Sequence, residues 1–592
     1  MDYNAVSHRC MLPDCYAVND EELVVRICTG KEVRAVSLVH EDPFADGCMG
    51  MKPWHGKAEP MQPTLELARS RVWSIRLRPK YKREQYYFFL YDGAEMVLLF
   101  EDGFYSPIEA AKPGRILQYF KFPWLNPSDV CRPPEWVKDM VWYQIMPDRF
   151  CKGGTMEKRM ALRGWNTPGD IGYQDFFGGD LPGIISKLDY LKSLGVTGIY
   201  MTPVFLSDSN HRYNTFDYDQ VDPDVGTEQD LRDLVEQAHA RGIRVMVDAV
   251  FNHCGAEFAP WRDVLKNGKN SPYYDWFFVN QEPLEDSSAN TEDGRYFTFA
   301  FEAYMPKLNT NHPDVMDYCV QRCKHWVTDW GVDGIRFDVG NEVSHTFLKK
   351  LRRELKQIAP DVFLLGEIWS DALPWLQGDE YDSVMNYPFF ESIHNFWLDQ
   401  DASAKDLMYA VNRCRMLYPE QVEAVLFNFL DTHDTPRAIN RCGNLDVFFQ
   451  QLTLLMTMPG SPCIYYGTEI AMEGKDDPNN RRPMPWDQIE RGDHDAVMRI
   501  VKALIHLRHS HPQLRSGMVK WEHGTASRLV SYRRFNEDRN TGIRIYLNAE
   551  AEAVSLHADR ILFQWKYSGG LLHGGGILVL EEINFGKEVS AP

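Results

Sequence analysis

Eight short apolar segments, separated by helix-length amphipathic stretches, dominate the middle of this 592-residue chain. The first is VWYQIMP (141–147), and the others follow in the order GVTGIYMTP, GIRVMVDAV, GVDGIRFDV, DVFLLGEIW, SVMNY, VLFNFLDTHD and SPCIYYG. Strands that are apolar along nearly their whole length are typical of a parallel sheet covered on both faces. Eight such units over about 365 residues predict a (β/α)8 TIM barrel, whose functional residues meet at the carboxyl ends of the strands.

The regions on both sides of the barrel predict β-domains. Residues 1–125 hold short runs rich in valine, isoleucine and aromatic residues, which are bounded by Gly, Asp or Pro and predict a β-sandwich. A proline-rich linker (126–137) leads to the barrel domain (138–505), and similar short runs in residues 506–592 predict a C-terminal β-sandwich. One connection, about 251–310 after the third strand, is long enough to form a small subdomain. The expected fold class is therefore multidomain, with a central TIM barrel flanked by two β-sandwiches.

The composition excludes several classes of protein. The chain has 64 Lys and Arg residues against 84 Asp and Glu residues, a formal net charge of −20, so we expect no nucleic-acid partner. We also expect no membrane, because no apolar run reaches the length of about 18 residues that a spanning helix needs. The start of the chain lacks the pattern of a secretory signal. The 12 cysteines are scattered without a CxxC pair, which predicts reduced thiols and a cytoplasmic protein.

Carboxylates stand at the ends of four predicted strands. Asp248, Asp338 and Glu367 close three successive strands, and Asp434 lies near the end of a later one. Because strand ends of a barrel converge on one mouth, these acids should face one another and raise one another's pKa. Any one of them alone could instead cap a helix or form a salt bridge with Arg336. All four together, beside two histidines and an arginine, predict an active site.

Two facing carboxyl groups suit the cleavage of a glycosidic bond, because one protonates the leaving oxygen while the other attacks the sugar. Arg336 lies two residues before Asp338 and should keep that aspartate ionised as a nucleophile. Glu367 lies in an apolar wall and should hold its proton as a general acid. Asp434 would stabilise the oxocarbenium-like transition state. Two histidines would donate hydrogen bonds to hydroxyls of the same sugar ring, namely His253 and His433.

Several motifs resemble one known family. DAVFNH, GIRFDVGNE, GEIW and FNFLDTHDT resemble, in that order, the four ordered sequence regions of the alpha-amylase superfamily of glycoside hydrolases. MPKLN (305–309) is similar to a fifth region in the form typical of neopullulanases, cyclomaltodextrinases and maltogenic amylases. Further stretches point to the same branch, among them YQIMPDRF, FFGGDL, NHRYNTFDY, GDEYDSVMNYP and DPNNRRPMPW. The resemblance covers residues 1 to about 505, which makes the combination highly specific.

The resemblance implies a role for each matching position. It makes Asp338 the nucleophile, Glu367 the general acid/base and Asp434 the transition-state stabiliser. It places four residues around the sugar at the cleavage subsite: Tyr213, which would stack on it, and His253, Arg336 and His433. It places Asp477 and Arg481 on the non-reducing side, and Asn341, Glu342 and Trp369 toward the acceptor side. Two further residues would support the site: Asp248 and Asn252.

The implied activity is that of a retaining α-glucan hydrolase. Such an enzyme would cleave α-1,4 and some α-1,6 bonds of cyclodextrins, pullulan and maltooligosaccharides, with transglycosylation as a side activity. The alternative is an α-1,4-glucan hydrolase that prefers linear maltooligosaccharides or acarbose-like pseudosugars. A more remote alternative is a catalytically silent glucan-binding protein, although silent relatives lose the acid set that this chain keeps. In the family, the N-terminal domain covers the barrel mouth of a second subunit, which implies a homodimer.

The chain departs from the family pattern at three places. Ser370 stands where the branch usually has histidine, and Gly340 stands where alanine is usual. Both departures lie next to acceptor subsites and leave the balance of hydrolysis and transglycosylation open. After PDRF, where relatives often carry a calcium-binding loop rich in Asn and Asp, this chain has CKGGTMEKRMALRGWN (151–166). Calcium prefers six or more oxygen ligands, so we expect no required cofactor and no calcium, although backbone carbonyls leave a metal site possible.

Overall fold

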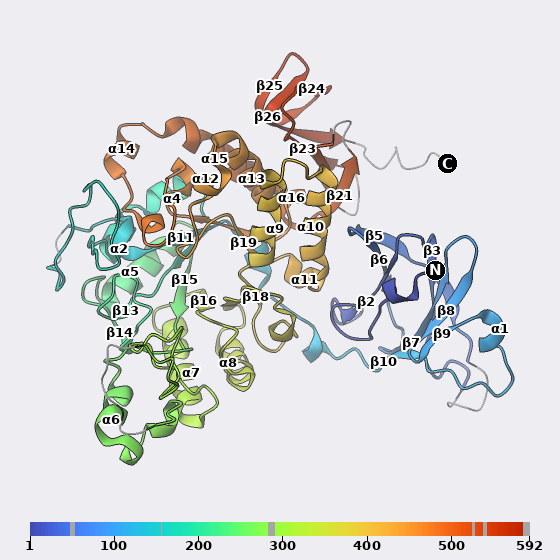
Figure 1. Cartoon of the computed structure of the whole chain (residues 1–592), viewed down its shortest axis with the longest axis horizontal. Helices are drawn as coiled ribbons and strands as arrows, with labels where there is room; N and C mark the ends of the chain where they lie inside the picture. The colour runs from blue at the N-terminus through green and yellow to red at the C-terminus, as the bar shows by residue number, and fades with distance from the viewer. Residues whose placement is uncertain are drawn as a thin grey trace. The chain divides into compact units, whose positions relative to one another are not determined.

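The computed structural model of the chain (Figure 1) describes residues 1–47, 54–154, 157–281, 284, 290–523, 527–536 and 541–583. It separates into two compact units. The first contains residues 1–132, 376–378 and 405–423, and the second contains residues 133–375, 379–404 and 424–592. Each unit is described by itself below.

The second unit contains the predicted barrel. Its eight parallel strands are β11 (Trp142–Ile145), β12 (Gly198–Met201), β15 (Arg244–Ala249), β16 (Gly334–Phe337), β17 (Phe363–Gly366), β18 (Ser383–Val384), β19 (Phe427–Phe429) and β20 (Ser461–Tyr465). They are hydrogen-bonded in the order β18-β17-β16-β15-β12-β11-β20-β19. A parallel bridge between Met385 and Phe427 joins the two edge strands, so the sheet closes on itself. Every one of the eight strands lies in a segment predicted from the sequence, and the TIM barrel is confirmed.

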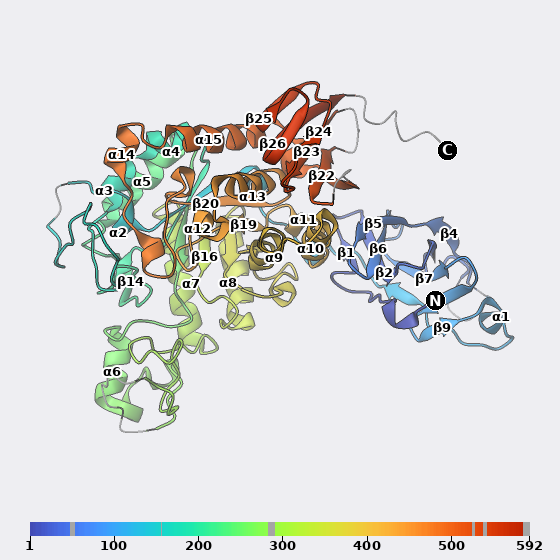
Figure 2. The ribbon, with the colours of Figure 1, turned by 45° about the horizontal axis from the view of Figure 1, so that its top comes forward.

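Helices surround these strands (Figures 1 and 2). The longer ones are α5 (Glu228–His239), α7 (Pro313–Thr328), α8 (His345–Ile358), α9 (Tyr387–Leu398), α13 (Leu445–Thr457) and α15 (Asp495–Ser510). The shorter ones include α2 (Pro147–Phe150), α3 (Leu181–Ser186), α4 (Leu188–Leu194), α12 (Ala438–Cys442) and α14 (Trp486–Glu490). In α8 the buried residues are Phe347, Leu348, Leu351 and Leu355. They fall at helical spacing on one face, which explains why this segment packs as an amphipathic helix.

Two long connections, after the second and the third barrel strand, contain additional structure. A short antiparallel hairpin, β13 (Phe205–Leu206) with β14 (Asp217–Val221), follows β12. After β15, the long connection contains α6 (Ala259–Asn267), which lies apart from the barrel in Figure 1. Isolated bridges tie this connection together, such as those that join Phe277 to Leu308 and Thr298 to Pro306. Both connections begin at the carboxyl ends of barrel strands, which is where functional loops of this fold lie.

The first unit is a β-sandwich. One antiparallel sheet contains β1 (Cys15–Ala17), β2 (Leu23–Gly30), β6 (Ser70–Leu77) and β5 (Gln62–Glu66) in that order. The other contains β4 (Lys57–Pro60), β3 (Ala35–Glu41), β7 (Glu84–Tyr91), β8 (Met96–Phe100) and β9 (Gly103–Tyr105), with β10 (Phe120–Phe122) paired to β7. Their shared core includes Ile27, Leu38, Trp73, Tyr86 and Phe88. The short apolar and aromatic runs of this region therefore form two sheets that pack on one shared core, as the sequence predicted.

The same unit includes two helices that lie between β18 and β19 in the sequence, α10 (Ala404–Met416) and α11 (Glu420–Glu423). Arg76 in β6 pairs with Glu420 at 2.6 Å, and the Asn412 side chain donates to the Glu66 carbonyl at 2.9 Å. The sandwich is thus bound to a segment about 345 residues away in the chain, a contact that no local sequence pattern indicates.

The C-terminal region is a single hydrogen-bonded sheet of six strands. They are β21 (Met518–His523), β22 (Leu529–Phe535), β23 (Thr541–Asn548), β26 (Leu571–Ile583), β24 (Val554–Ser555) and β25 (Ile561–Ser568). This sheet contacts α13 and α15 (Figure 2). The Gln450 side chain of α13 donates to the Asn548 carbonyl at 2.9 Å, for example. Within the ranges given above, no helix is both long and apolar enough to cross a lipid bilayer.

Candidate active site

Neighbouring barrel strands bring the predicted acids together. Asp248 in β15 is the direct register partner of Arg336 in β16, so both side chains point to the same side of the sheet. Asp338 follows the last residue of β16, and Glu367 follows the last residue of β17. The three carboxylates and the guanidinium therefore lie at one level, where strands three, four and five of the barrel end.

Arg336 connects the three acids. Its side chain is fully buried, and Nη1 donates to both Asp248 oxygens at 2.9 Å and to Asp338 Oδ1 at 2.9 Å. Its Nη2 forms an ion pair with Glu367 Oε2, also at 2.9 Å. A buried guanidinium that contacts three carboxylates fixes their relative positions through charge-assisted hydrogen bonds. Without it, the buried carboxylates would have no compensating charge.

The sequence predicted two opposite effects on Asp338: a pKa raised by the facing acids and a pKa held low by Arg336. Burial raises the pKa of Asp338 well above its ordinary value; Arg336 opposes the shift, while Glu367 and the other nearby acids add to it. Burial likewise raises the pKa of Asp248, against the effect of Arg336. The arginine thus does not by itself hold Asp338 at a low pKa.

Glu367 is oriented by three contacts. Its Oε2 accepts a hydrogen bond from the Val339 backbone at 2.9 Å, besides its ion pair with Arg336. Its Oε1 accepts from the indole Nε1 of Trp369 at 3.1 Å. The Trp369 ring, about half exposed, stacks on Tyr387 with a centroid separation of 3.9 Å. The carboxyl group is therefore held at a fixed angle beside an exposed aromatic face.

Asp434 lies in the loop after β19, next to an arginine and a histidine. Its Oδ1 pairs with Arg481 Nη2 at 3.2 Å, and its Oδ2 lies 3.1 Å from His433 Nε2. Arg481 also pairs with Asp477 Oδ1 at 3.2 Å. Burial alone would lower the pKa of Arg481, but Asp434 and Asp477 raise it. Of the two residues predicted on the non-reducing side, Arg481 thus contacts Asp434 directly, and Asp477 is linked to it through Arg481.

His433 and Tyr213 form a stacked pair. Their rings are 5.3 Å apart and nearly parallel, and the Tyr213 hydroxyl donates to Asp248 Oδ2 at 2.9 Å. The Gln144 side-chain amide lies 2.7 Å from His433 Nδ1. Burial lowers the pKa of His433 well below its ordinary value, so the ring is neutral. With Nδ1 accepting from the amide, Nε2 carries the proton and donates it to the Tyr213 hydroxyl oxygen at 2.6 Å, with Asp434 Oδ2 at 3.1 Å.

His253 is buried, and within the described chain its Nε2 has no hydrogen-bond partner. Its ring stacks on Phe299 at 4.9 Å, and burial lowers its pKa to about 3. The neighbouring Asn252 accepts a hydrogen bond from Lys307, which also pairs with Glu342 Oε2 at 2.9 Å. A buried polar atom without a partner is a place where a ligand group can bind.

Some predicted residues lie away from the acid cluster, and some residues that we did not predict contact the site. Asn341 is exposed four residues after the end of β16, and Glu342 is linked to the site through Lys307. The unpredicted contributors are Gln144, Tyr200, Lys307 and Tyr387. Three of them lie in motifs that the sequence had already marked, YQIMPDRF, MPKLN and GDEYDSVMNYP. Within the described ranges, no group of three or more His, Cys, Asp or Glu side chains could hold a metal ion.

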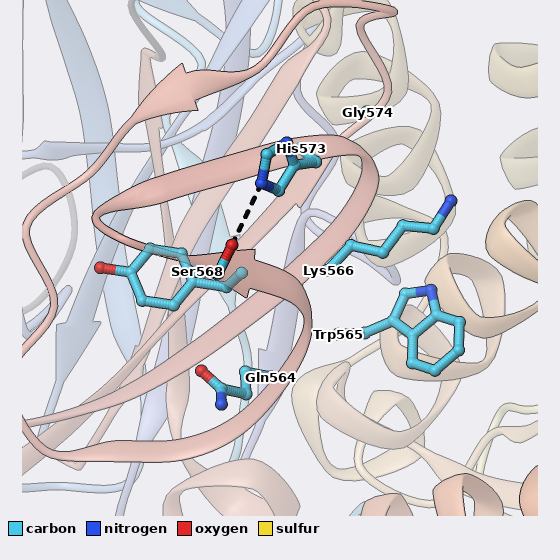
Figure 3. A pocket seen from close by; sticks show the side chains of 7 residues that line it. Gln564, Trp565, Lys566, Ser568, His573 and Gly574 are labelled. Carbon is cyan, nitrogen blue, oxygen red and sulfur yellow. Dashed lines mark hydrogen bonds between the residues drawn. The ribbon is translucent and has the colours of Figure 1, made fainter.

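A surface cavity of about 460 Å³ lies elsewhere in the unit, on the β25–β26 hairpin of the C-terminal sheet (Figure 3). It is lined by Gln564, Trp565, Lys566, Tyr567, Ser568, His573 and Gly574. Figure 3 shows His573 hydrogen-bonded to Ser568, at 3.3 Å. None of the predicted site residues lines this cavity.

Two facing carboxyl groups at the mouth of a TIM barrel are the catalytic groups that a glycoside hydrolase uses. The comparisons with known proteins agree. The family model for the alpha amylase catalytic domain matches residues 144–527, and that for the alpha amylase N-terminal ig-like domain matches residues 1–126. The chain belongs to the alpha-amylase family of glycoside hydrolases.

Individual relatives fall in the branch that the motifs indicated. The chain is 41% identical over 562 residues to a cyclomaltodextrinase of Geobacillus thermopakistaniensis (strain MAS1), which covers 94% of this chain and 92% of the relative. It is 40% identical over 479 residues to neopullulanase 2 of Thermoactinomyces vulgaris, with 80% of each chain covered. A solved cyclomaltodextrinase structure matches with a TM-score of 0.87 at 36% identity, over 99% of both chains. The resemblance stated from the motifs is confirmed.

Proposed function

We propose that this enzyme is a retaining hydrolase of α-glucans that cleaves α-1,4 and some α-1,6 glucosidic bonds of cyclodextrins, pullulan and maltooligosaccharides, with transglycosylation as a side activity. The observation that carries the proposal is the pairing of Asp338 and Glu367 with the same buried guanidinium. This arrangement supports a nucleophile and a proton donor on one glycosidic bond. The names of the relatives, cyclomaltodextrinase and neopullulanase, support the substrate class.

In the proposed mechanism, Asp338 attacks the anomeric carbon while Glu367 gives its proton to the leaving glycosidic oxygen. A covalent glycosyl-enzyme forms, and Glu367 then takes a proton from water or from an acceptor sugar hydroxyl, which displaces Asp338. Asp338 must be ionised for this attack, and Arg336, which donates to its Oδ1, favours that form against the effect of burial. Asp434, between Arg481 and His433, would accept hydrogen bonds from sugar hydroxyls as positive charge develops on the ring.

The remaining residues would bind sugars on either side of the cleaved bond. Tyr213 would stack on the sugar at the cleavage subsite, and Nε2 of His253 and of His433 would donate to its hydroxyls. Asp477 and Arg481 would bind toward the non-reducing side. The exposed face of Trp369, with Asn341 and Glu342, would receive the acceptor. Asp248 and Asn252 would support the site through Arg336 and Lys307.

The stereochemistry of the product tests this mechanism. With an α-linked substrate followed by NMR, a retaining enzyme releases the α-anomer first, and β-anomer as the first product would overturn the assignment. Asp338→Asn should lower kcat by about three orders of magnitude or more, because it removes the covalent route. Asp371→Asn is a matched control, since Asp371 is exposed just beyond GEIWS. A tenth of wild-type activity in Asp338→Asn would mean that another group is the nucleophile.

The alternative substrate preference, linear maltooligosaccharides or acarbose-like pseudosugars, is favoured by no particular contact. Initial rates on cyclodextrin, pullulan, starch and maltotriose, with products separated by size, distinguish the two. A further part of the proposal is that the enzyme is a cytoplasmic homodimer. Relatives named intracellular maltogenic amylase support the location. Exposed apolar side chains on the sandwich support a partner surface: Phe44, Tyr81, Ile108, Ile116 and Trp124.

A further inference from the structure

Three buried carboxylates lie together outside the acid set of the active site. Asp180 precedes α3, while Asp222 and Asp224 follow β14. Their exposed fractions are 1%, 1% and 5%. Carboxylates buried to this degree are strongly destabilising unless cations or hydrogen-bond donors compensate them. The identity of the compensating charge therefore matters for the stability of this part of the barrel.

The compensation comes from one loop, the segment that follows PDRF (151–166). The Lys158 ammonium pairs with Asp180 Oδ2 at 2.8 Å and donates to the Asp224 carbonyl at 2.7 Å, and this side chain is only 7% exposed. The Gly153 backbone donates to the other Asp180 oxygen at 2.7 Å. The ammonium is thus surrounded by oxygen atoms from separate parts of the chain, as a bound metal ion would be.

Arg159 completes the charge balance. Its Nη2 pairs with Asp222 Oδ1 at 2.8 Å, and its Nε pairs with Asp224 Oδ2 at 3.1 Å. Its backbone N–H donates to Asp224 Oδ1 at 2.6 Å. Two successive cationic residues therefore satisfy all three buried acids.

These contacts bear on the calcium site that the family resemblance raised for this loop. Calcium needs six or more oxygen ligands with negative charge to spare. Here the oxygens of Asp180, Asp222 and Asp224 already accept from an ammonium and a guanidinium. A divalent ion placed among them would meet two positive charges. The described residues of the loop therefore do not fit a metal ion; Thr155 and Met156 lie outside the described residues.

The network continues toward the candidate active site. The second oxygen of Asp222 accepts from the Ser207 backbone at 3.0 Å and lies 3.4 Å from Arg212 Nε. Arg212 has a φ of 62°, a left-handed conformation that a residue with a side chain adopts only when its surroundings hold it there. The next residue is Tyr213, which contacts Asp248 and His433. Arg159 thus connects through Asp222 to the backbone that presents Tyr213.

We propose that Lys158 and Arg159 form an internal cation that takes the place of a metal ion in this loop, and that Arg159, through Asp222, is a positioning residue for Tyr213. The first part stands on the ion pairs that these two residues form with the three buried acids. The second part rests on the proposed function, because Tyr213 matters only if its ring contacts substrate.

Thermal unfolding of the full-length protein tests the first part. The wild-type Tm should be the same in excess EDTA, in millimolar CaCl₂ and in buffer alone. Lys158→Gln should lower Tm by about 5 °C, since it leaves Asp180 buried without its cation. Lys158→Arg should recover at least half of the loss because it keeps the charge. Lys152→Gln, at an exposed lysine of the same loop, should leave Tm unchanged.

Two results would overturn the internal cation. One is a wild-type Tm that falls in EDTA and returns with calcium, which would show a bound metal ion. The other is a Lys158→Gln variant as stable as Lys152→Gln. If Lys158→Gln does not fold, the wild-type measurement and Lys158→Arg decide: a calcium-dependent wild type, or an arginine variant that also fails to fold, contradicts the proposal.

A double-mutant cycle tests the positioning role. Arg159→Gln should lower kcat/KM on maltotriose about five-fold or more, and Arg159→Lys should recover part of it. In a Tyr213→Ala background the same Arg159→Gln change should have no effect on kcat/KM, because the ring it positions is gone. Equal losses in both backgrounds would reduce Arg159 to a structural role. A wild-type enzyme inactive on all α-glucans would instead overturn the proposed function. The Tm measurements would still test whether Lys158 and Arg159 replace a metal ion.

Discussion

At the scale of single residues, the acid set was predictable from its position, whereas its surroundings were not. Asp338 and Glu367 follow strands whose apolar run is unmistakable, so their meeting at one mouth follows from the barrel alone. Gln144, which orients His433, is 289 residues away in the chain. Only tertiary packing brings such a pair together. The raising of the Asp338 pKa by its neighbouring acids was predicted, but its largest cause, burial of the carboxyl group, depends on tertiary packing.

Gly340 is a departure from the family pattern that the structure explains. A Cβ at this position would lie 2.9 Å from the Tyr381 hydroxyl and 3.1 Å from the backbone nitrogen of Glu367. The Tyr381 hydroxyl also donates to the Gly340 carbonyl at 3.0 Å. Alanine, usual in the branch, would therefore press on the strand end that carries the proposed acid.

Gly340→Ala should lower kcat about three- to ten-fold, because a shift of tenths of an ångström at Glu367 disturbs the alignment of a proton donor. The double variant Gly340→Ala with Tyr381→Phe should recover much of this loss, since it removes the atom in closest contact. Steady-state kinetics on one substrate, with Tyr381→Phe alone as the control, measure the effect. Wild-type kcat in Gly340→Ala would show that the site absorbs the methyl group without moving Glu367.

His8 predicts a dependence of stability on pH. It packs against Tyr86, Phe88 and Phe120, and burial lowers its pKa to about 4. The folded state therefore prefers the neutral ring, while an unfolded histidine takes up a proton near pH 6.5. The contribution to stability is complete above pH 6.5 and is lost as the pH falls toward 4, by about 3 kcal/mol.

Calorimetry of the full-length protein between pH 7 and pH 4 measures this loss. In His8→Gln, the unfolding transition of the sandwich should depend less on pH over this range than in the wild type. His557→Gln, at a histidine that is 88% exposed in its side chain, is the matched control. A His8→Gln variant with the same pH slope as the wild type would assign the acid sensitivity to other groups.

At the scale of elements, the strands were predicted better than the connections. Continuous apolar runs mark buried parallel strands whatever their neighbours are, so even the two-residue strand β18 (Ser383–Val384) lies in a predicted segment. The β13–β14 hairpin was not predicted, since its pairing is short and irregular. The grouping of residues 405–423 with the sandwich was not predicted either, because it depends on contacts such as that of Arg76 with Glu420.

Helix α3 gives a prediction that runs against helix propensity. Alanine is a better helix former than glycine by about 1 kcal/mol, so Gly183→Ala should stabilise an isolated helix. In the folded chain, however, a Cβ at Gly183 would lie 2.0 Å from the Cys151 carbonyl oxygen. The glycine is required because the backbone of the loop that carries Lys158 crosses the helix there.

We expect Gly183→Ala to destabilise the protein by about 2 kcal/mol or more, because neither backbone can move away easily. The measurement is the shift of the unfolding midpoint in denaturant. Gly172→Ala provides the comparison, because its Cβ would meet only the Asp175 side chain at 3.4 Å, an ordinary contact. Equal midpoints for the two variants would mean that the crossing is looser than the structure shows.

At the scale of the whole molecule, the resemblance predicts that the sandwich domain binds a second subunit. Several aromatic residues that could have formed a partner surface fill its core instead, among them Trp73, Tyr86 and Phe88. Apolar side chains nevertheless remain outside: Ile108 and Ile116 are 79% and 84% exposed. Their exposure suits contact with a second protein surface better than contact with water.

The last prediction links assembly to substrate choice. If the sandwich covers the barrel mouth of a second subunit, short and cyclic glucans enter while branched starch is excluded by size alone. The full-length enzyme should then be a dimer that prefers cyclodextrin or maltotriose to starch. Deletion of residues 1–125 should give a monomer with a higher relative rate on starch. It would also uncover residues 405–423, so the double variant Ile108→Asp, Ile116→Asp should be tested beside it. Sedimentation equilibrium and rates on the three substrates decide, and a full-length monomer that still prefers cyclodextrin would separate specificity from assembly.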